Sequence, residues 1–196
     1  MGMITVVSPP PAASDHELLA RHAAGDREAL EELFQRYRAV AYRVAYRLLG
    51  QEADALDAVQ DGFVKALTHL SAFQGRSSFK TWLLRVVSNA ALDLGRQRGR
   101  RELRSLDGLV AGDPDSPLTF DDPARRLERA DLRQFIREAL LSLSEVQRQT
   151  FILHADGGLS YREVAEALRI SVGTVMSRLF YARQKLRAYL AQRIEL

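Results

Sequence analysis

Aromatic, hydroxyl, amide and arginine side chains are concentrated between Phe73 and Arg104, where the sequence reads FQGRSSFKTWLLRVVSNAALDLGRQRGRRELR. Arginine side chains hold phosphates, aromatic rings stack on bases, and an amide can pair with the edge of a base. This combination of residue types is the chemistry that holds a single strand of nucleic acid. The stretch also fits a purely structural interpretation, in which Phe79 and Trp82 belong to the core and the arginines form a solvated tail.

A helix is expected to begin near Phe79, because the hydroxyl of Ser77 or Ser78 can accept from the free amides of the first turn. At about 100° per residue, the following residues separate onto two faces. The apolar face holds Phe79, Leu83, Val86, Val87, Ala90 and Leu94. The polar face, which we expect to be open to a ligand, holds Thr81, Arg85, Ser88 and Asn89. Past the expected helix come Arg96, Arg98, Arg100, Arg101 and Arg104, against the single carboxylate of Glu102.

Composition limits the class of protein. The 196 residues carry a net charge of +3, are 46% hydrophobic and include no cysteine. Disulfides, thiolate nucleophiles and cysteine-ligated zinc are therefore excluded, and a reducing cytoplasm is the expected location. The first residues lack a basic flank and a long apolar core, so residues 1–13 are predicted to be a disordered leader. No run approaches the roughly 20 apolar residues that span a bilayer, so no membrane insertion is expected.

Helical periodicity is the only regular pattern in the chain, so the predicted fold is all-α, with two small helical domains joined by a flexible acidic linker. The linker, residues 105–124, has five aspartates, three prolines and no lysine or arginine, a composition that cannot bury enough surface to order itself. The predicted domains are residues 14–104 and 125–196. Capping boxes are expected at Ser14, Ser144 and Ser160, each followed three residues later by Glu or Gln.

The segment DALDAVQDGFVKALTHL, residues 54–70, predicts a helix with two different faces. Its expected core face holds Leu56, Val59, Phe63, Leu67 and Leu70. Its other face is a mainly acidic stripe of Asp54, Asp57, Asp61 and Lys65. From spacing alone, such a stripe is most simply a solvated surface.

The end of the chain has the plan of a helix-turn-helix unit, in which a short helix from Ser160, a tight turn at Arg169 and Ile170 and a longer helix capped by Ser171 follow one another. The expected buried stripe of the last helix is Val172, Val175, Leu179, Ala182 and Leu186. Its outer face holds Thr174, Ser177, Arg178, Tyr181, Gln184 and Lys185. In this plan the second helix enters the major groove of DNA. The alternative is a helical hairpin whose polar face is solvated and binds no ligand.

Three motifs in this order resemble the extracytoplasmic-function (ECF) sigma factors of bacterial RNA polymerase, the group 4 members of the sigma-70 family, from Asp15 to Leu190. The segment DALDAVQDGFVKAL resembles the region that docks on the polymerase. The stretch FQGRSSFKTWLLRVVSNAALDLGR resembles the part that opens and reads the minus-ten element. The segment GLSYREVAEALRISVGTVMSRLFYARQKLR resembles the part that reads the minus-35 element.

The resemblance implies roles for individual residues. The core-binding residues would be Asp57, Gln60, Asp61, Phe63 and Lys65. The minus-ten residues would be Phe73, Arg76, Ser78, Phe79, Lys80, Trp82, Arg85, Asn89 and Arg96, with the loop from Phe73 to Phe79 receiving a flipped base. The minus-35 residues would be Ser160, Arg162, Thr174, Ser177, Arg178 and Tyr181. The family often has arginine where Met176 and Tyr181 stand, so the promoter sequence cannot be transferred from relatives.

The implied partners are the largest and beta subunits of the polymerase core, promoter DNA and an anti-sigma factor, with the free protein a monomer. The implied function is binding, so no cofactor, metal or catalytic group is expected. Two other hypotheses compete. A free-standing repressor or activator would bind its operator without polymerase, commonly as a dimer. An enzyme acting on nucleic acid would need metal ligands or a nucleophile with a base, and the four histidines are scattered without such spacing.

Overall fold

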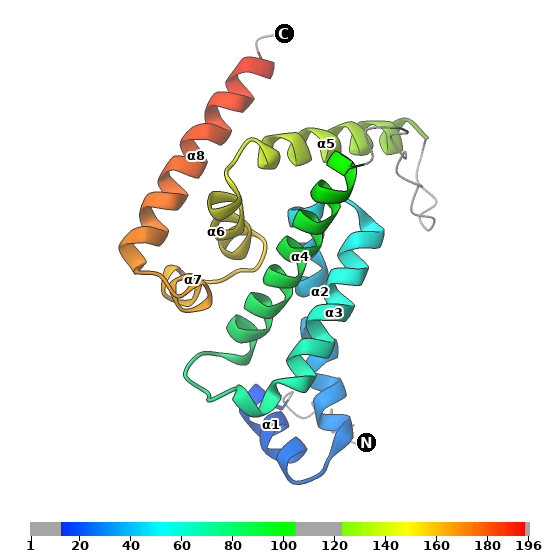
Figure 1. The fold of residues 1–196 in the computed structure, drawn as a ribbon, viewed down its shortest axis with the longest axis vertical. Helices are drawn as coiled ribbons and strands as arrows, with labels where there is room; N and C mark the ends of the chain where they lie inside the picture. The colour runs from blue at the N-terminus through cyan, green and yellow to red at the C-terminus, as the bar shows by residue number, and fades with distance from the viewer. Residues whose placement is uncertain (1–12, 105–122, 195–196) are drawn as a thin grey trace, which may run out of the picture. The chain divides into compact units, whose positions relative to one another are not determined.

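The computed structural model describes residues 13–104 and 123–194, and these residues form only helices and the turns between them (Figure 1). The predicted all-α fold is confirmed. The predicted leader, residues 1–13, and the predicted linker, residues 105–124, lie almost entirely outside the described residues. The helices are α1 (Asp15–Ala23), α2 (Arg27–Leu49), α3 (Glu52–Thr68), the 3-10 turn η1 (Leu70–Ala72), α4 (Phe79–Arg104), α5 (Pro123–Leu141), α6 (Glu145–Ala155), α7 (Tyr161–Leu168) and α8 (Val172–Ile194).

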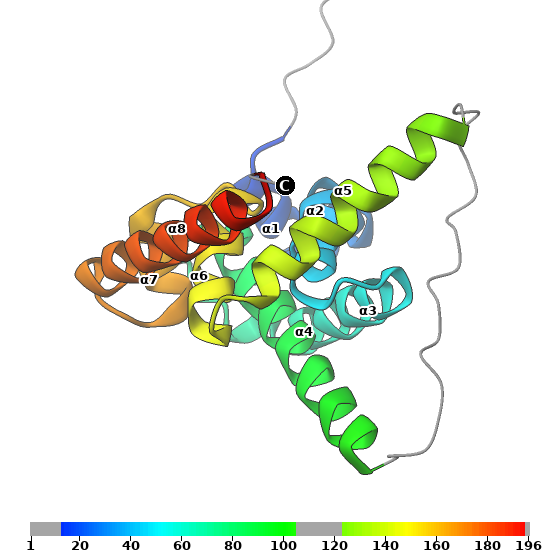
Figure 2. The same ribbon diagram turned by 90° about the horizontal axis from the view of Figure 1, so that it is seen from above.

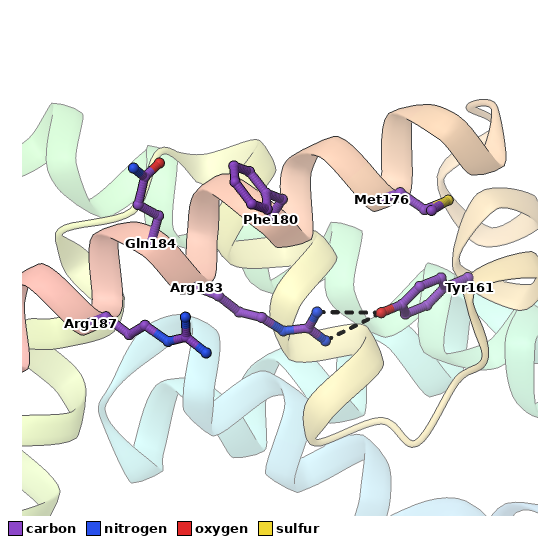
Figure 3. Close-up of a pocket in the computed structure, with 6 residues that line it drawn as sticks. All are labelled: Tyr161, Met176, Phe180, Arg183, Gln184 and Arg187. Carbon is purple, nitrogen blue, oxygen red and sulfur yellow. Dashed lines mark hydrogen bonds between the residues drawn. The ribbon is translucent and has the colours of Figure 1, made fainter.

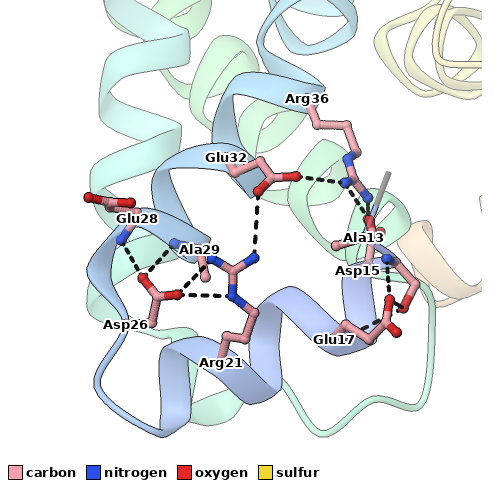
Figure 4. Close-up of polar contacts among 10 residues, drawn as sticks. Ala13, Asp15, Glu17, Arg21, Asp26, Glu28, Ala29, Glu32 and Arg36 are labelled. Carbon is pink, nitrogen blue, oxygen red and sulfur yellow. Dashed lines mark hydrogen bonds and ion pairs between the residues drawn. The ribbon is translucent and has the colours of Figure 1, made fainter. Parts of the chain in front are cut away.

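The chain divides into two compact units, the first ending at Tyr37 and the second beginning at Arg38. In the first unit, the Ser14 hydroxyl accepts from the backbone N–H of Glu17, and the Glu17 carboxylate accepts from the N–H of Ser14, which is the predicted capping box (Figure 4). Asp15 then receives hydrogen bonds from Arg36 at 2.8 Å and from the Tyr37 hydroxyl at 2.5 Å. These polar contacts join α1 to the first half of α2.

In the second unit, α3 and α4 lie side by side, as both ribbon views show (Figures 1 and 2). Gly62 sits where the two helices approach closely, because a Cβ added there would come within 2.9 Å of Val87 Cγ2. The residues of α3 that turn inward are mostly small: Ala55, Ala58, Val59, Gly62 and Ala66. Residues three and four apart share one face of a helix, so these small side chains together let the two backbones come near each other.

This close packing corrects two expectations about α3. Leu56 and Leu67 were expected in the core but are about half exposed, because the buried face is centred on the alanines instead. Asp54 was expected on the acidic stripe but is buried, and its carboxylate pairs with the guanidinium of Arg98 on α4. Arg98 also donates to Gln51 at 2.9 Å. One of the predicted aspartates is thus part of the α3–α4 interface.

The helix α4 is longer than expected, since it continues through the arginine cluster to Arg104. Arginine is a good helix former, and Arg96 pairs with Asp93, three residues earlier, at 2.6 Å. The expectation that these arginines follow the helix was wrong. The arginines from Arg96 to Arg104 are residues of α4 itself.

The helices α6, α7 and α8 form the predicted helix-turn-helix unit. The capping boxes at Ser144 and Ser160 are both present, and Ser171 accepts from the N–H of Thr174 at 3.0 Å to cap α8. Arg169 ends α7 with a left-handed backbone, φ 54° and ψ 47°, which turns the chain toward α8. Val175, Leu179 and Ala182 are fully buried. Val172 was expected in the buried stripe of the last helix but is exposed.

No helix among the described residues is both long enough and apolar enough to cross a membrane.

Candidate nucleic-acid interface

Three aromatic rings hold the start of α4 and the loop before it. The ring of Phe73 lies edge-on to that of Phe79, with centroids 5.7 Å apart, and Trp82 lies 5.4 Å from Phe73 and 5.6 Å from Phe79. Ser78 is the N-cap, since its hydroxyl accepts from the N–H of Thr81 at 3.1 Å. The loop from Phe73 to Phe79 is therefore anchored at both ends by packing between its own rings.

The burial of these rings separates their roles. Phe79 is buried, so in this structure it supports the loop and presents no surface to a ligand. Phe73 and Trp82 are half-buried and keep part of each ring accessible. Arg76 and Ser78 are exposed on the loop. Gly75, at the tip of the loop, has a φ of +66°, a backbone conformation that favours glycine.

The polar face of α4 was expected to be exposed, but α6 and α7 cover much of it. Ser88 is fully buried and Thr81 nearly so. The side-chain amide of Gln149 donates to Ser88 Oγ and to Asn89 Oδ1, both at 3.2 Å. Asn89 itself remains exposed beside this contact. Gln149 thus engages this part of the face through hydrogen bonds.

Polar side chains of this face contact acceptors on α6, on α7 and in the turn between these two helices. Lys80 Nζ donates to the carbonyl of Gly158 at 3.3 Å, and Arg96 pairs with Glu145 at 2.6 Å. Thr81 Oγ1 donates to Glu163 at 3.4 Å. The hydrogen bond that Arg96 makes to Asp93, followed by the charge of Glu145, raises the pKa of its guanidinium. Lys80 and Arg96 thus contact carbonyl and carboxylate oxygens. The oxygens of a phosphate could accept the same hydrogen bonds.

Arg85 lies on the same face and is half-buried. Burial, with a smaller contribution from the positive charge of Arg169, lowers the pKa of its guanidinium. A nearby positive charge disfavours the charged form of Arg85, and a bound anion would offset this repulsion. Arg169 lies in the turn before α8. The sequence pattern did not predict a binding role for this residue.

The outer face of α3 holds the residues that the resemblance assigned to polymerase binding. Asp57, Gln60, Asp61 and Lys65 are exposed, and Phe63 is half-buried. Lys65 and Asp61 form an ion pair one helical turn apart at 2.7 Å. A surface pair of this kind contributes little to stability, so the pair of Asp61 and Lys65 has no evident role in stabilising the fold.

The outer side of the helix-turn-helix unit carries the residues predicted for the minus-35 element. Ser177 and Tyr181 are exposed on α8, while Thr174 and Arg178 are half-buried. Thr174 Oγ1 shares a hydrogen bond with Ser171 Oγ at 2.8 Å, and Ser160 is occupied in its capping box. Arg162 is exposed on the first turn of α7.

A second group on α8 was not predicted as a site from the sequence. An open pocket is lined by Met176, Phe180, Arg183 and Arg187 of α8, by Gln184 of the predicted outer face, and by Tyr161 of α7. The signal was present in the sequence, because Met176 and Phe180 are large apolar residues four apart, outside the buried stripe of Val175 and Leu179. No group of three or more potential metal-ligating side chains occurs in the part of the chain that the structure describes.

Comparison with known proteins identifies the class to which this fold and these surfaces belong. The family model for sigma-70 region 2 matches residues 33–101, and the model for sigma-70 region 4 matches residues 133–186. The first match contains α3 and the polar face of α4, and the second contains the helix-turn-helix unit. The chain belongs to the sigma-70 family, whose members direct promoter-specific transcription by RNA polymerase.

Individual relatives narrow the class further, to the ECF sigma factors. The ECF RNA polymerase sigma-E factor of Escherichia coli strain K12 is 34% identical over 175 residues, covering 87% of this chain and 91% of that protein. The ECF RNA polymerase sigma factor SigE of Mycolicibacterium smegmatis is 34% identical over 177 residues, and the chain spans 66% of its length, just under two thirds. The sigma factor RpoE of Bartonella quintana, solved in complex with the anti-sigma factor NepR, matches with a TM-score of 0.62 at 28% identity, covering 82% of this chain and 98% of that one.

Proposed function

We propose that this sigma factor uses three separate surfaces: the outer face of α3 for the polymerase core, the polar face of α4 with its preceding loop for the minus-ten element, and α8 for the minus-35 element. The observation that carries the proposal is α8 itself. It follows a short helix and a left-handed turn, exposes its outer face, and contains four arginines and one lysine but no carboxylate between Val172 and Ile194. Such a helix is suited to the major groove of DNA.

At the minus-ten element we infer that the promoter strand takes the place of α6 and α7 on α4. The groups that Lys80, Asn89 and Arg96 now contact are a carbonyl, an amide and a carboxylate. A phosphate offers the same kind of acceptor, and a base edge offers the same kind of amide and carbonyl groups. The contacts within the protein and the contacts to DNA therefore exclude each other at these residues. The half-buried rings of Phe73 and Trp82 supply the stacking surface beside the anchored loop.

The exposed stripe of α3 is the proposed docking surface for the core. Asp57 and Asp61 lie one turn apart on this stripe, and neither is required for packing against α4. Negative charge on an exposed helix face gives specificity and a faster encounter with a basic partner surface. An anti-sigma factor is a further proposed partner, as the Bartonella quintana relative was solved with one.

In this proposal the chain acts by binding free energy and carries out no bond chemistry. Extruding a base from the duplex costs a few kilocalories per mole, and stacking of the captured base returns roughly 1 to 3 kcal/mol. We further propose that the protein acts in the cytoplasm, binds DNA well only with the core, and is monomeric when free.

The test is reconstitution with a purified bacterial core polymerase. Transcription start sites would first be mapped after overexpression, and the commonest promoter would then be transcribed in vitro with core alone and with core plus this chain. We expect initiation at the mapped site only in the presence of the chain. Failure to bind core, or tight operator binding by the free chain without any initiation, would contradict the proposal and favour a free-standing regulator.

A further inference from the structure

Large apolar side chains lie exposed along one side of α8. Val172, Met176 and Phe180 follow one another at intervals of four residues, and we call these three the apolar strip. Met176 is 55% exposed and Phe180 is 63% exposed. A single exposed apolar residue is ordinary, but several in a row on one helix face indicate a surface that something covers.

The strip has a defined border. Figure 3 shows Met176 beside the ring of Tyr161, with Arg183 and Arg187 on the next turns of the same side of α8. The guanidinium of Arg183 donates two hydrogen bonds, each of 3.4 Å, to the hydroxyl of Tyr161. This contact ties α8 to the first residue of α7 and fixes one edge of the pocket.

The charges on α8 itself are of one sign. The residues of α8 include Arg178, Arg183, Lys185 and Arg187 in the part whose side chains are described, and the helix sequence has no aspartate or glutamate. An occupant that is apolar in the middle and anionic at its edges fits this arrangement. Duplex DNA has both properties, because its phosphates line the major groove and the C5 methyl of thymine is the apolar group on the groove floor.

We propose that Met176 and Phe180 select thymine in the upstream promoter element by contact with its C5 methyl group. Neither side chain can donate a hydrogen bond to the O6 and N7 acceptors of guanine, so neither can read guanine as arginine does. Arg183 and Arg187 hold the phosphates beside the methyl groups. This inference rests on the proposed role of α8 and specifies what the helix reads.

The experiment compares thymine with uracil, which differs only by the missing methyl group. The holoenzyme would first select upstream elements from duplexes randomised in that region, and we expect thymines on either strand at the positions that α8 protects. Each of these thymines would then be replaced by uracil. Loss of one buried methyl is expected to weaken holoenzyme binding about threefold to fourfold. Uracil placed upstream of the protected region should have no effect.

Substitutions assign the effect to the two side chains. The variants Met176→Ala and Phe180→Ala should bind the thymine and uracil duplexes equally, because the contact is absent in both. The control is Leu132→Ala, which removes an equally exposed apolar side chain from α5 and should keep the preference for thymine. Since Met176 and Phe180 are more than half exposed, the variants should fold, and circular dichroism would verify this.

The possible failures are distinguishable. If the holoenzyme protects no upstream region, the proposed function of α8 is wrong. If it protects that region but the wild type binds uracil and thymine duplexes equally, or selects no thymine, only the methyl-reading inference is overturned. It is also overturned if both alanine variants keep the thymine preference, or if they lose only the binding of an anti-sigma protein, which would make the apolar strip a protein-docking surface.

Discussion

The side-chain amide of Gln149, on α6, donates a hydrogen bond of 3.2 Å to the hydroxyl of Ser88, on α4. The two residues are 61 positions apart, and both are buried. Because Gln149 also donates to Asn89, one side chain occupies two groups on the face proposed to read the minus-ten element. In this conformation α6 occupies part of that face.

Replacing Gln149 by alanine should open this face. Gln149→Ala removes both hydrogen bonds to α4, while Ser88 keeps its hydrogen bond to the Arg85 carbonyl, so the closed conformation loses about 0.5 to 1.5 kcal/mol for each bond removed. We expect the free chain to bind a single-stranded minus-ten oligonucleotide several-fold more tightly, as measured by fluorescence anisotropy. The matched control is Gln134→Ala, whose exposed amide contacts only Glu138 among the hydrogen bonds of the structure. Equal or weaker binding by a folded Gln149→Ala variant would show that the contact does not compete with DNA.

Substitutions on α4 and α3 should separate DNA reading from polymerase binding. Asn89→Ala removes the exposed amide proposed to pair with a base, so promoter use should fall about tenfold while core binding is retained. Asp61→Arg reverses a charge on the proposed docking face, so core binding should fall while the α4 face stays intact. Core affinity would be measured by size-exclusion binding and promoter use by run-off transcription. Equal losses of both activities in each variant would mean that the two faces are misassigned.

A side chain at Gly62 should destabilise the fold. In Gly62→Ala the new Cβ would lie 2.9 Å from Val87 Cγ2 and 3.0 Å from Val87 Cα, so α3 and α4 would have to move apart. We expect a loss of about 1 to 3 kcal/mol in the free energy of unfolding, measured by urea denaturation. Gly99→Ala is the control, because a Cβ at that position of α4 meets nothing within 4 Å. Its expected effect is a gain of about 0.5 to 1 kcal/mol from better helix propensity.

The left-handed conformation of Arg169 should carry a measurable strain. Among the described residues it is the one non-glycine position with a positive φ. Arg169→Gly and Arg169→Ala both remove the cation, but only glycine relieves the clash between Cβ and the backbone. We expect the glycine variant to be more stable than the alanine variant by about 1 to 2 kcal/mol in thermal and urea unfolding. A smaller difference would indicate that the turn relaxes when the side chain is shortened.

The capping box of α7 should make stability depend on acid pH. Hydrogen bonding to Ser160, with a smaller contribution from Thr81, lowers the pKa of Glu163 below its ordinary value of 4.5. A lowered folded-state pKa gives a stabilisation that is complete above about pH 4.5 and disappears as the pH falls through the folded value. Glu163→Gln should therefore be less stable than the wild type at pH 7.

The difference between Glu163→Gln and the wild type should shrink as urea unfolding is repeated toward pH 3, below the ordinary pKa of 4.5. The control repeats this comparison in a Ser160→Ala background, where the main hydroxyl partner of the carboxylate is missing. There the pH dependence should be weaker but still present, because the backbone N–H of residue 160 still donates to the carboxylate, which is the larger cause of the lowered pKa. The same acid-side loss in both backgrounds would mean that the Ser160 hydroxyl contributes nothing to it.

Local features were the most predictable from sequence. The capping boxes at Ser14, Ser144 and Ser160 and the turn at Arg169 were confirmed, and of the two serines predicted as the N-cap of α4 the structure has Ser78. Each of these features depends on residues within one helical turn of each other. The end of α4 was predicted too early. Arg98 in this extension pairs with Asp54, which is remote in sequence, so the contact leaves no local signal.

The buried faces were less predictable because periodicity shows that a helix has two faces but not how closely its neighbour approaches. On α3 the contact is centred on Gly62 and the alanines, which leaves Leu56 and Leu67 exposed. On α8 the register of Val175 and Leu179 was correct, yet Val172, which was expected in the same stripe, is exposed.

By itself the sequence determined an all-α chain, its helix starts and its helix-turn-helix unit, since these follow from interactions between residues a few positions apart. Only the tertiary structure decided that the polar face of α4 is covered by α6 and α7, and that an apolar strip on α8 remains uncovered. Both outcomes depend on contacts between surfaces that lie far apart in the chain. A hydrogen bond such as that between Gln149 and Ser88 has no counterpart in the spacing of residues along the sequence, so it could not be predicted.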